Sequence, residues 1–331
     1  MGNFSDPNRP LIPFTFKGRA RRDAKPDGSQ GPYPLVIVSH GYTGSRLLFT
    51  YLTENLASKG YVVVSIDHTD STFQDANAFT STLLNRSLDD LFVLNEIDRM
   101  NSDSNSFLKD LVDTENTALI GYSMGGYGAV NVAGGGYSEK AVQFFTYASK
   151  GSNALEKRKM GNPEFLASFD KRFKAVVAMA PWGMGNEVWD AEGLKGVRIP
   201  TLFVAGSKDD ISGYEKGVKA IYQGAVNCER YLLTYFDARH NIAPNPPIED
   251  VMAPGLHIDE YLRYADSVWD QRRINNINQH FITAFLGVKL KNKTAYLPYL
   301  DAKTLETQDP WEGFLPRTSI GLEFRMDSPE E

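Results

Sequence analysis

The feature that most constrains this 331-residue chain is a serine flanked by glycines at the junction between a predicted strand and a predicted helix. The apolar run 118–120 predicts a buried strand. The sequence Gly-Tyr-Ser-Met-Gly occupies 121–125, and the residues at 129–133 can start a helix. A serine on such a strand–turn–helix lies on a strained turn, with its hydroxyl exposed at the end of the strand. We therefore expect Ser123 to carry chemistry.

The two glycines of this turn have a packing reason. A side chain at Gly121 or Gly125 would collide where the strand and the helix approach closely. At roughly 7% each for Gly and Ser, the pattern Gly-x-Ser-x-Gly arises by chance about 0.1 times in a chain of this length. The strand before it and the helix after it make coincidence rarer still, so we interpret the turn as functional.

The rest of the chain repeats strand and helix signals in alternation. Runs of apolar residues rich in Val, Ile and Leu predict strands covered on both faces, and apolar residues at helical spacing follow several of them. The predicted strands occupy 34–39, 61–66, 118–120, 173–179, 200–205 and 230–236. The predicted helices lie around 48–56, 84–94, 129–133, 213–223 and 274–286. This alternation predicts the α/β class, with a mostly parallel sheet and helices on both faces.

We expect residues 1–331 to form one α/β domain. Residues 134–172 break the alternation, beginning with three glycines and continuing with many charged residues. We interpret them as an insertion after the nucleophile helix, either a surface excursion or a cap over the active site.

Three further expectations concern the N-terminal region, the first helix and the C-terminal stretch. Residues 11–16 are expected to form an edge strand, and Ser45 is expected to cap the first helix. Trp311 and Phe314 indicate that the C-terminal stretch 304–331 docks on the body of the protein.

Composition argues against several classes of function and structure. The net charge of −6 leaves no excess of Lys and Arg to neutralise phosphates, which argues against a nucleic-acid partner. Cys228, the single cysteine, cannot form an intrachain disulfide and is expected to be a buried small hydrophobic residue. No run of 18 apolar residues predicts a transmembrane segment. The polar start of the chain predicts a cytoplasmic protein, or a secreted one whose signal segment has been removed.

Polar side chains follow four of the predicted strands. In an open parallel sheet, ligand sites form at the carboxyl ends of the strands. These ends carry His40 to Thr43, Ser123, Asp209 with Asp210, and His240. The chain order serine, acid, histidine is the order of the Ser–acid–His triad found on such sheets.

Each member of this triad has a chemical role. A serine hydroxyl is a poor nucleophile until a base takes its proton, and His240, which directly follows a strand, is the candidate base. His257, in a proline-rich loop, is the weaker rival, and His280 is interpreted as a structural residue in the closing helix. The acid must orient the imidazole and stabilise its charged form. Asp209 and Asp210 both fit, and Asp209 is preferred because Ile211, two residues on, can anchor the loop.

The remaining site residues are expected around the serine. Negative charge that develops on a carbonyl oxygen requires backbone N–H donors, which we assign to Met124 and Tyr42. Trp182 either forms an aromatic wall of the substrate site or packs in the core. His40 and His68 are expected to line the pocket or to brace its loops. This chemistry requires no metal and no organic cofactor.

Four stretches together resemble a known family. They are 40–44 (His-Gly-Tyr-Thr-Gly), 56–67 (Leu-Ala-Ser-Lys-Gly-Tyr-Val-Val-Val-Ser-Ile-Asp), 121–126 (Gly-Tyr-Ser-Met-Gly-Gly) and 180–182 (Ala-Pro-Trp). They resemble the dienelactone-hydrolase-like branch of the α/β-hydrolases. Within it they look most like bacterial cutinase-type polyester hydrolases and platelet-activating-factor acetylhydrolases. The resemblance covers roughly residues 34–133 and 173–290.

The resemblance implies the same site as the residues do. It implies Ser123 as nucleophile, His240 as base, and Tyr42 and Met124 as oxyanion donors, with Trp182 as a wall of the acyl pocket. In the cutinase-type pattern the acid lies nine residues after the proline that opens the strand, which implies Asp209. The chain departs from that pattern in residues 134–172, in an abbreviated N-terminal region, and in lacking the cysteines for a C-terminal disulfide.

Three functions fit these residues. The first is a serine carboxylic-ester hydrolase that acts through an acyl-enzyme on short-chain or aromatic esters, or on polyesters. The second is a lipid or acetyl hydrolase of the platelet-activating-factor acetylhydrolase type, with a covered apolar pocket. The third is a catalytically silent hydrolase fold used for binding. The presence of all three triad residue types argues against this third function. The sequence does not indicate the oligomeric state.

Overall fold

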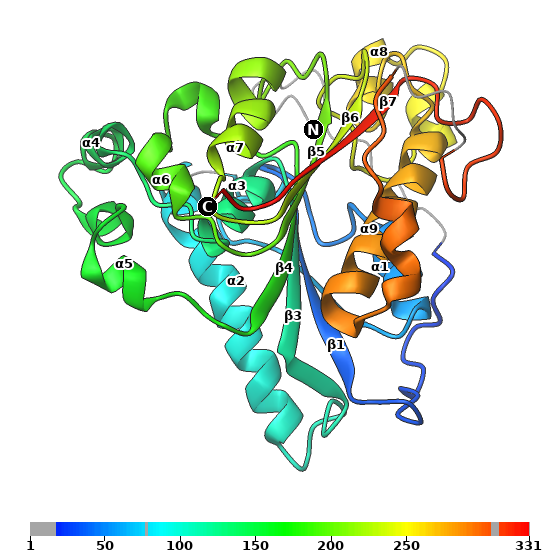
Figure 1. Ribbon diagram of the computed structural model, residues 1–331, viewed down its shortest axis with the longest axis horizontal. Coiled ribbons are helices and arrows are strands. Elements are labelled where there is room, and N and C mark those ends of the chain that lie inside the picture. Colours follow the sequence, from blue (N-terminus) through cyan, green and yellow to red (C-terminus); the bar gives the residue numbers. More distant parts are fainter. Residues whose placement is uncertain (1–17, 77–78, 306–310, 331) are drawn as a thin grey trace.

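The sheet at the centre of the molecule is mostly parallel. A computed structural model describes residues 18–76, 79–305 and 311–330, and these form a seven-stranded sheet of order β2-β1-β3-β4-β5-β6-β7 (Figure 1). Neighbouring strands pair in parallel, except that β7 is antiparallel to β6. The strands are β1 (Tyr33–Ser39), β2 (Val62–Ile66), β3 (Val112–Tyr122), β4 (Phe173–Met179), β5 (Thr201–Gly206), β6 (Arg230–Tyr235) and β7 (Leu322–Asp327).

Helices cover both faces of the sheet, as Figure 1 shows. The longer ones are α1 (Thr50–Ser58), α2 (Phe79–Ser102), α3 (Met124–Val132), α4 (Glu139–Ala148) and α9 (Gln271–Lys291). The shorter ones are α5 (Pro163–Ala167), α6 (Ala191–Lys195), α7 (Lys219–Gly224) and α8 (Ile258–Leu262). Short 3-10 or π segments are η1 (Ala154–Arg158), η2 (Met184–Asn186), η3 (Tyr214–Val218), η4 (Glu249–Met252) and η5 (Thr294–Leu300).

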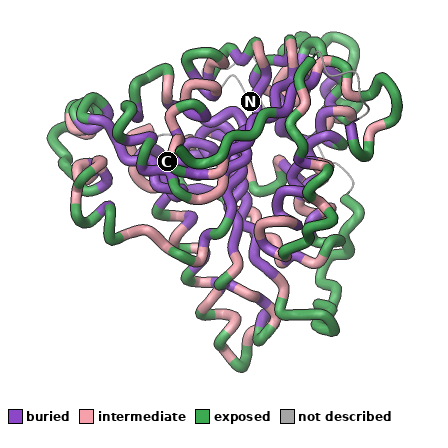
Figure 2. Tube along the Cα trace, in the orientation of Figure 1, coloured by how far each residue is buried: buried purple, intermediate pink, exposed green. Residues whose placement is uncertain are grey.

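Alternating residues of each central strand enter two separate cores. Leu35 and Ile37 of β1 pack with α2, α3, α6 and α7 on one face. Val36 and Val38 pack with α1 and α9 on the other face. Figure 2 shows the buried residues concentrated along the sheet, with exposed residues on the outer helices and loops. The predicted α/β class, a mostly parallel sheet with helices on both faces, is confirmed.

Several boundaries differ from the sequence-based expectations. Ser45 does not cap the first helix: α1 begins at Thr50 after Phe49, without a side-chain cap. The expected edge strand at 11–16 lies outside the described residues. The antiparallel strand β7 was not expected. Of the C-terminal stretch, Trp311 is buried against Phe281 of α9, with ring centroids 6.1 Å apart, so this part does dock on the body.

Residues 134–172 form α4, η1 and α5. The apolar side of α4 joins the core beneath α2. In Figure 1, α4 and α5 lie beside α2 and α6 at one side of the sheet, whereas α8 lies on the opposite side of the view. The pocket next to His240 is lined by residues of 259–267 and not by residues of this segment. We therefore propose a surface insertion rather than a cap.

Within the described part of the chain, no helix combines the length and the apolar character that a membrane crossing requires.

Candidate active site

Ser123 lies on a strained turn between β3 and α3. Its φ of 53° and ψ of −112° fall in a region that residues other than glycine rarely adopt. The glycines on each side permit the turn. A β-carbon on Gly121 would lie 2.0 Å from the Gly125 carbonyl oxygen, and one on Gly125 would lie 2.2 Å from the Ser39 carbonyl oxygen. The Ser123 carbonyl accepts hydrogen bonds from the N–H groups of Tyr127 (2.9 Å) and Trp182 (3.1 Å), which hold the turn.

The structure brings Ser123, His240 and Asp209 together in one hydrogen-bonded line. The Ser123 Oγ is 3.0 Å from His240 Nε2, and His240 Nδ1 is 3.0 Å from each carboxylate oxygen of Asp209. Asp209 Oδ1 also accepts hydrogen bonds from the N–H groups of Ile211 (2.9 Å) and Ser212 (2.8 Å). Since Nδ1 faces a carboxylate, it carries the proton, and Nε2 is free to accept the proton of the serine hydroxyl.

The three side chains come from three strand ends and are buried. Ser123 and His240 are each 4% exposed and Asp209 is 7% exposed. In a site of low dielectric, charges and hydrogen bonds act more strongly than they do in water. The arrangement can therefore transfer a proton from the serine hydroxyl to the imidazole while the carboxylate stabilises the imidazolium.

The alternative acid and bases lie elsewhere. Asp210 forms an ion pair with Arg239 at the surface instead of contacting His240. His257 is exposed at the start of α8, where it pairs with Asp259. His280 lies in α9 among aromatic rings, and burial lowers the pKa of its imidazole.

Two backbone N–H groups next to the serine can serve as oxyanion donors. Met124 is the first residue of α3, and an N–H in the first turn of a helix has no partner within the helix. Tyr42 follows Gly41, whose backbone approaches the serine so closely that a β-carbon on it would lie 3.2 Å from Ser123 Cβ. Within the described residues, neither the Tyr42 N–H nor the Met124 N–H donates a hydrogen bond.

Three aromatic rings lie edge to face around this turn. The Phe79 ring is 5.5 Å from both the Tyr42 and the Trp182 ring centroids. Trp182 is half-buried and also contacts Tyr127 at 6.1 Å, so it combines core packing with an accessible edge. Phe79 was missed by sequence reasoning. It begins α2, and the leucine spacing farther along that helix gave no sign that its first residue joins the site.

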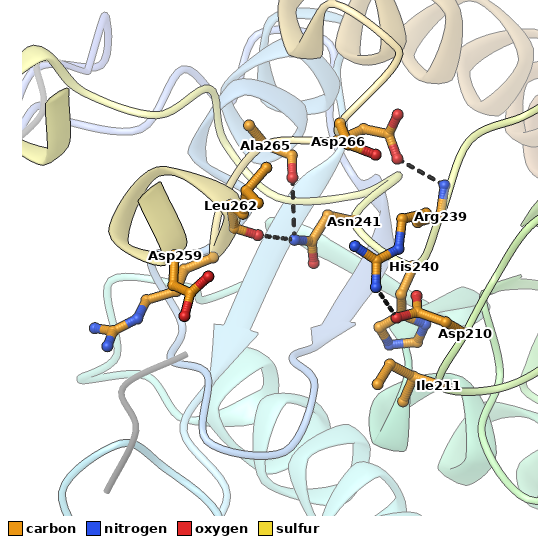
Figure 3. Close-up of a pocket in the computed structure, with 11 residues that line it drawn as sticks. Asp210, Ile211, Arg239, His240, Asn241, Asp259, Leu262, Ala265 and Asp266 are labelled. Carbon is orange, nitrogen blue, oxygen red and sulfur yellow. Dashed lines mark hydrogen bonds and ion pairs between the residues drawn. The ribbon is translucent and has the colours of Figure 1, made fainter. Parts of the chain in front are cut away.

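A pocket of about 280 Å³ lies beside His240 (Figure 3). Ile211 and the ion pair of Asp210 with Arg239 lie on one side of it, and α8 lies on the other. Asn241 lies between them and donates hydrogen bonds to the carbonyls of Leu262 (2.6 Å) and Ala265 (3.2 Å). The lining thus combines apolar with charged groups.

His40 and His68 lie inside the protein, 1% and 2% exposed. Burial and the nearby Arg86 lower the pKa of both imidazoles, which keeps them neutral. Their ring nitrogens contact groups of the protein, including the Gly41 carbonyl and the Ser39 hydroxyl. Of the two expected roles, this placement favours bracing the loops over contacting substrate.

Comparisons with known proteins find similar sequences in one group of hydrolases. The family described as PET hydrolase-like matches residues 24–150. Cutinase 2 of Thermobifida cellulosilytica is 26% identical over 215 residues, which are 65% of this chain and 63% of that protein. Cutinase cut1 of Thermobifida fusca is 26% identical over 215 residues, 65% of this chain and 51% of that protein. Cutinase est2 of Thermobifida alba is 24% identical over 213 residues, 64% of this chain and 54% of that protein.

The fold and the serine turn define an α/β-hydrolase. Within that class, the chain is similar to the PET hydrolase-like family over residues 24–150 and to cutinases at about 25% identity, which confirms the cutinase-type resemblance. The match spans between about half and 63% of the length of these cutinases.

Proposed function

We propose that the protein is a serine carboxylic-ester hydrolase that works through an acyl-enzyme. The observation that carries the proposal is the hydrogen-bonded line from Ser123 Oγ to His240 Nε2, at 3.0 Å, and on from His240 Nδ1 to Asp209. The sequence similarity supports it, because the similar proteins include several named as cutinases.

In the acylation step, His240 Nε2 takes the proton of the Ser123 hydroxyl as Oγ bonds to the ester carbonyl carbon. The carbonyl π electrons move onto its oxygen, and the N–H groups of Tyr42 and Met124 donate hydrogen bonds to the resulting anion. When the tetrahedral intermediate collapses, the bond to the leaving oxygen breaks. The imidazolium gives its proton to that oxygen, and an alcohol leaves.

In the deacylation step, water takes the place of the alcohol. His240 removes a proton from the water as its oxygen attacks the acyl carbon, and the same N–H groups stabilise the second anion. Collapse of this intermediate breaks the bond to Ser123 Oγ, which regains its proton from the imidazolium. The Asp209 carboxylate stabilises the imidazolium in both steps.

The site favours esters with a compact or aromatic acyl group. The rings of Tyr42, Phe79 and Trp182 offer aromatic faces and edges next to the serine. Because Ser123 is only 4% exposed, small esters are favoured over segments of a polymer chain. This low exposure also favours, as a second candidate, an acetyl or lipid hydrolase with a covered site.

The decisive experiment compares wild type with Ser123→Ala on p-nitrophenyl acetate and butyrate. We expect the variant to lose several orders of magnitude in kcat with its fold intact. A fluorophosphonate probe should label wild type and not the variant. Folded wild type that neither hydrolyses the esters nor takes up the probe would favour a catalytically silent binding protein.

An ester panel separates the substrate classes. A sharp optimum at short acyl chains, with no release of product from polyester film, would favour a covered small-substrate site. Sustained release from the film would favour the polyester hydrolase, and a preference for acetyl esters of lipids would favour the second candidate.

A further inference from the structure

We propose that Arg86, acting together with His40, is a positioning residue of this site. It holds the carbonyl of Gly41 so that the N–H of Tyr42 faces the place where the oxyanion forms. This inference rests on the ester-hydrolase function proposed above and adds a residue from α2 to its machinery.

The Gly41 carbonyl is held by three donors. His40 Nδ1 lies 2.6 Å from its oxygen, the Gly44 N–H lies 3.0 Å away, and Arg86 Nη2 lies 3.4 Å away. A carbonyl fixed by three hydrogen bonds from different directions has little freedom to rotate. The orientation of the peptide group that joins Gly41 to Tyr42 is therefore set from inside the protein.

That orientation fixes the Tyr42 N–H as well. The Gly41–Tyr42 peptide is trans, and in a trans peptide the C=O and the N–H point in opposite directions. Holding the carbonyl inward towards Arg86 turns the N–H outward. Gly41 packs against Ser123, with only 3.2 Å between a β-carbon built on it and Ser123 Cβ, so the outward N–H lies beside the nucleophile.

Arg86 is itself fixed by several partners. It is 1% exposed, and its Nη1 donates to the His40 carbonyl while its Nη2 donates to the Ser71 hydroxyl. Nη1 also lies 3.4 Å from Ser39 Oγ. One guanidinium thus joins the end of β1 to the loop after β2. The planar fork of arginine suits this task, since it aims several N–H groups in fixed directions, whereas a lysine offers one flexible ammonium.

His40 supports the same carbonyl because its tautomer is fixed. The backbone N–H of His68 donates to His40 Nε2 over 3.2 Å, so the ring proton lies on Nδ1, which donates to Gly41. His68 is held in turn by Ser39 Oγ at 2.7 Å and by Asp89 at 2.8 Å.

The charge of Arg86 acts in the same direction as its geometry. Burial lowers the pKa of the guanidinium to about 10, which still leaves it charged at neutral pH. Asp90 is buried in the same region, and its carboxylate oxygens have no hydrogen-bond partner among the described residues. Burial raises the pKa of Asp90 well above its usual value, which favours its neutral form. The positive charge of Arg86, on the inner side of the Gly41–Tyr42 peptide, favours the negative charge of an oxyanion on the outer side.

The test compares Arg86→Lys, Arg86→Met and Ser71→Ala with wild type. Arg86→Lys keeps the charge and loses the fork, whereas Ser71→Ala removes one anchor of the guanidinium and is a mild change. Arg230→Met is the matched control. Arg230 is also a buried arginine, but it lies at the start of β6, the end of that strand away from His240, and donates to the Ser328 carbonyl over 3.1 Å.

The readouts are kcat and KM on p-nitrophenyl butyrate and the Ki of an alkyl trifluoromethyl ketone, with the melting temperature of each variant. The ketone forms a tetrahedral adduct on serine whose oxyanion occupies the same place as that of the reaction.

We expect both Arg86 variants to lose roughly 10- to 100-fold in kcat, with KM changed by less than about 3-fold. The Ki should rise by a similar factor, because only tetrahedral states use the N–H. Ser71→Ala should show the same pattern more weakly, and Arg230→Met should lower only the melting temperature.

Folded Arg86 variants with wild-type kcat and Ki would overturn the positioning role. If the Arg86 variants do not fold, Ser71→Ala and His40→Gln take their place in the test. An unchanged kcat and Ki in both of these variants would also overturn the positioning role. Failure of the ester-hydrolase function itself would look different, since wild type would then be inactive or Ser123→Ala would retain its activity.

Discussion

The backbone of Gly125 lies directly against the carbonyl of Ser39. A β-carbon on Gly125 would be 2.2 Å from that oxygen, so the helix after the nucleophile and the end of β1 touch through their backbones. This contact couples the serine turn to the loop that carries Tyr42, the proposed oxyanion donor. The fold of the sheet and the geometry of the site therefore depend on the same close approach.

A methyl group at this position should damage both. We expect Gly125→Ala to push α3 away from β1, lowering the free energy of unfolding by about 3 kcal/mol, at the upper end for overpacked sites. Activity per folded molecule should fall as well. Denaturant unfolding and active-site titration measure the two effects. Gly185→Ala is the control, because no atom lies within 4 Å of a β-carbon built there. Equal stability of the two variants would contradict the prediction.

The two neighbouring aspartates should differ sharply in their effect on catalysis. Asp209→Asn keeps the shape of the side chain but no longer stabilises the imidazolium, so kcat should fall by about 10³- to 10⁴-fold. Asp210→Asn loses only an ion pair at the surface with Arg239, and its kcat should stay within about 3-fold of wild type. Steady-state kinetics on p-nitrophenyl butyrate measure both. A larger loss in Asp210→Asn would transfer the role of the acid to that residue.

Much of this site was predictable from local patterns, because its constraints are local. Ser123 is identified by the two glycines that its turn requires, and His240 by its position directly after a strand. Asp209 was preferred over Asp210 because Ile211 was expected to anchor the loop, and that reason is wrong: Ile211 is 57% exposed, and only its N–H bonds to the Asp209 carboxylate, at 2.9 Å. For Ser123 and His240, a few neighbouring residues determine which side chain can reach the end of the sheet.

Other features depend on contacts between distant segments and had no local signal. Arg86 meets Gly41 only because α2 packs beneath the loop after β1. On its own helix, it looks like one more charged residue among leucines. The strand β7 was not predicted for a related reason. It is an edge strand that contains charged residues, and two of them, Glu323 and Arg325, form a 2.8 Å hydrogen bond between their side chains. Its burial arises from β6 and α9, which precede it by many residues.

The single cysteine should be inert in the folded protein. Cys228 is 1% exposed, and burial raises the pKa of its thiol to about 12. The thiolate, which is the reactive form, is therefore scarce at pH 8. We expect Ellman's reagent to leave native protein unlabelled over hours and to label one thiol per chain in denaturant. Rapid labelling of native protein at pH 8 would contradict this burial.

Asp89 should make stability depend on pH in the mildly acidic range. Desolvation raises the pKa of its carboxyl from an ordinary value near 3.8 to about 6, although Arg86 opposes the shift. Between these two values the folded protein binds more protons at Asp89 than the unfolded chain does, so this contribution to stability falls as the pH rises. It is fully present below about pH 4 and lost above about pH 6.

The matched variant is Asp89→Asn, which keeps an oxygen that can accept the hydrogen bond of His68 Nδ1. Urea midpoints of wild type and variant should be compared from pH 4 to pH 7. We expect wild type to lose stability relative to the variant as the pH rises through this window. A constant difference between the two midpoints would mean that the pKa of Asp89 is the same in the folded and unfolded chains.

The aromatic ring at the start of α2 should govern the choice of acyl group. Phe79 lies 5.5 Å from both the Tyr42 and Trp182 ring centroids, so its removal leaves both rings without an edge-to-face partner. We expect Phe79→Ala to lower kcat/KM for p-nitrophenyl benzoate by about 10-fold, which corresponds to about 1.4 kcal/mol, the scale of one aromatic contact. For p-nitrophenyl acetate, whose acyl group is too small to reach the rings, the change should be less than about 3-fold. Phe92→Ala is the control, because Phe92 lies on the same helix with its side chain in solvent. If benzoate and acetate hydrolysis fall equally in Phe79→Ala, the ring supports the fold of the loop and does not select the substrate.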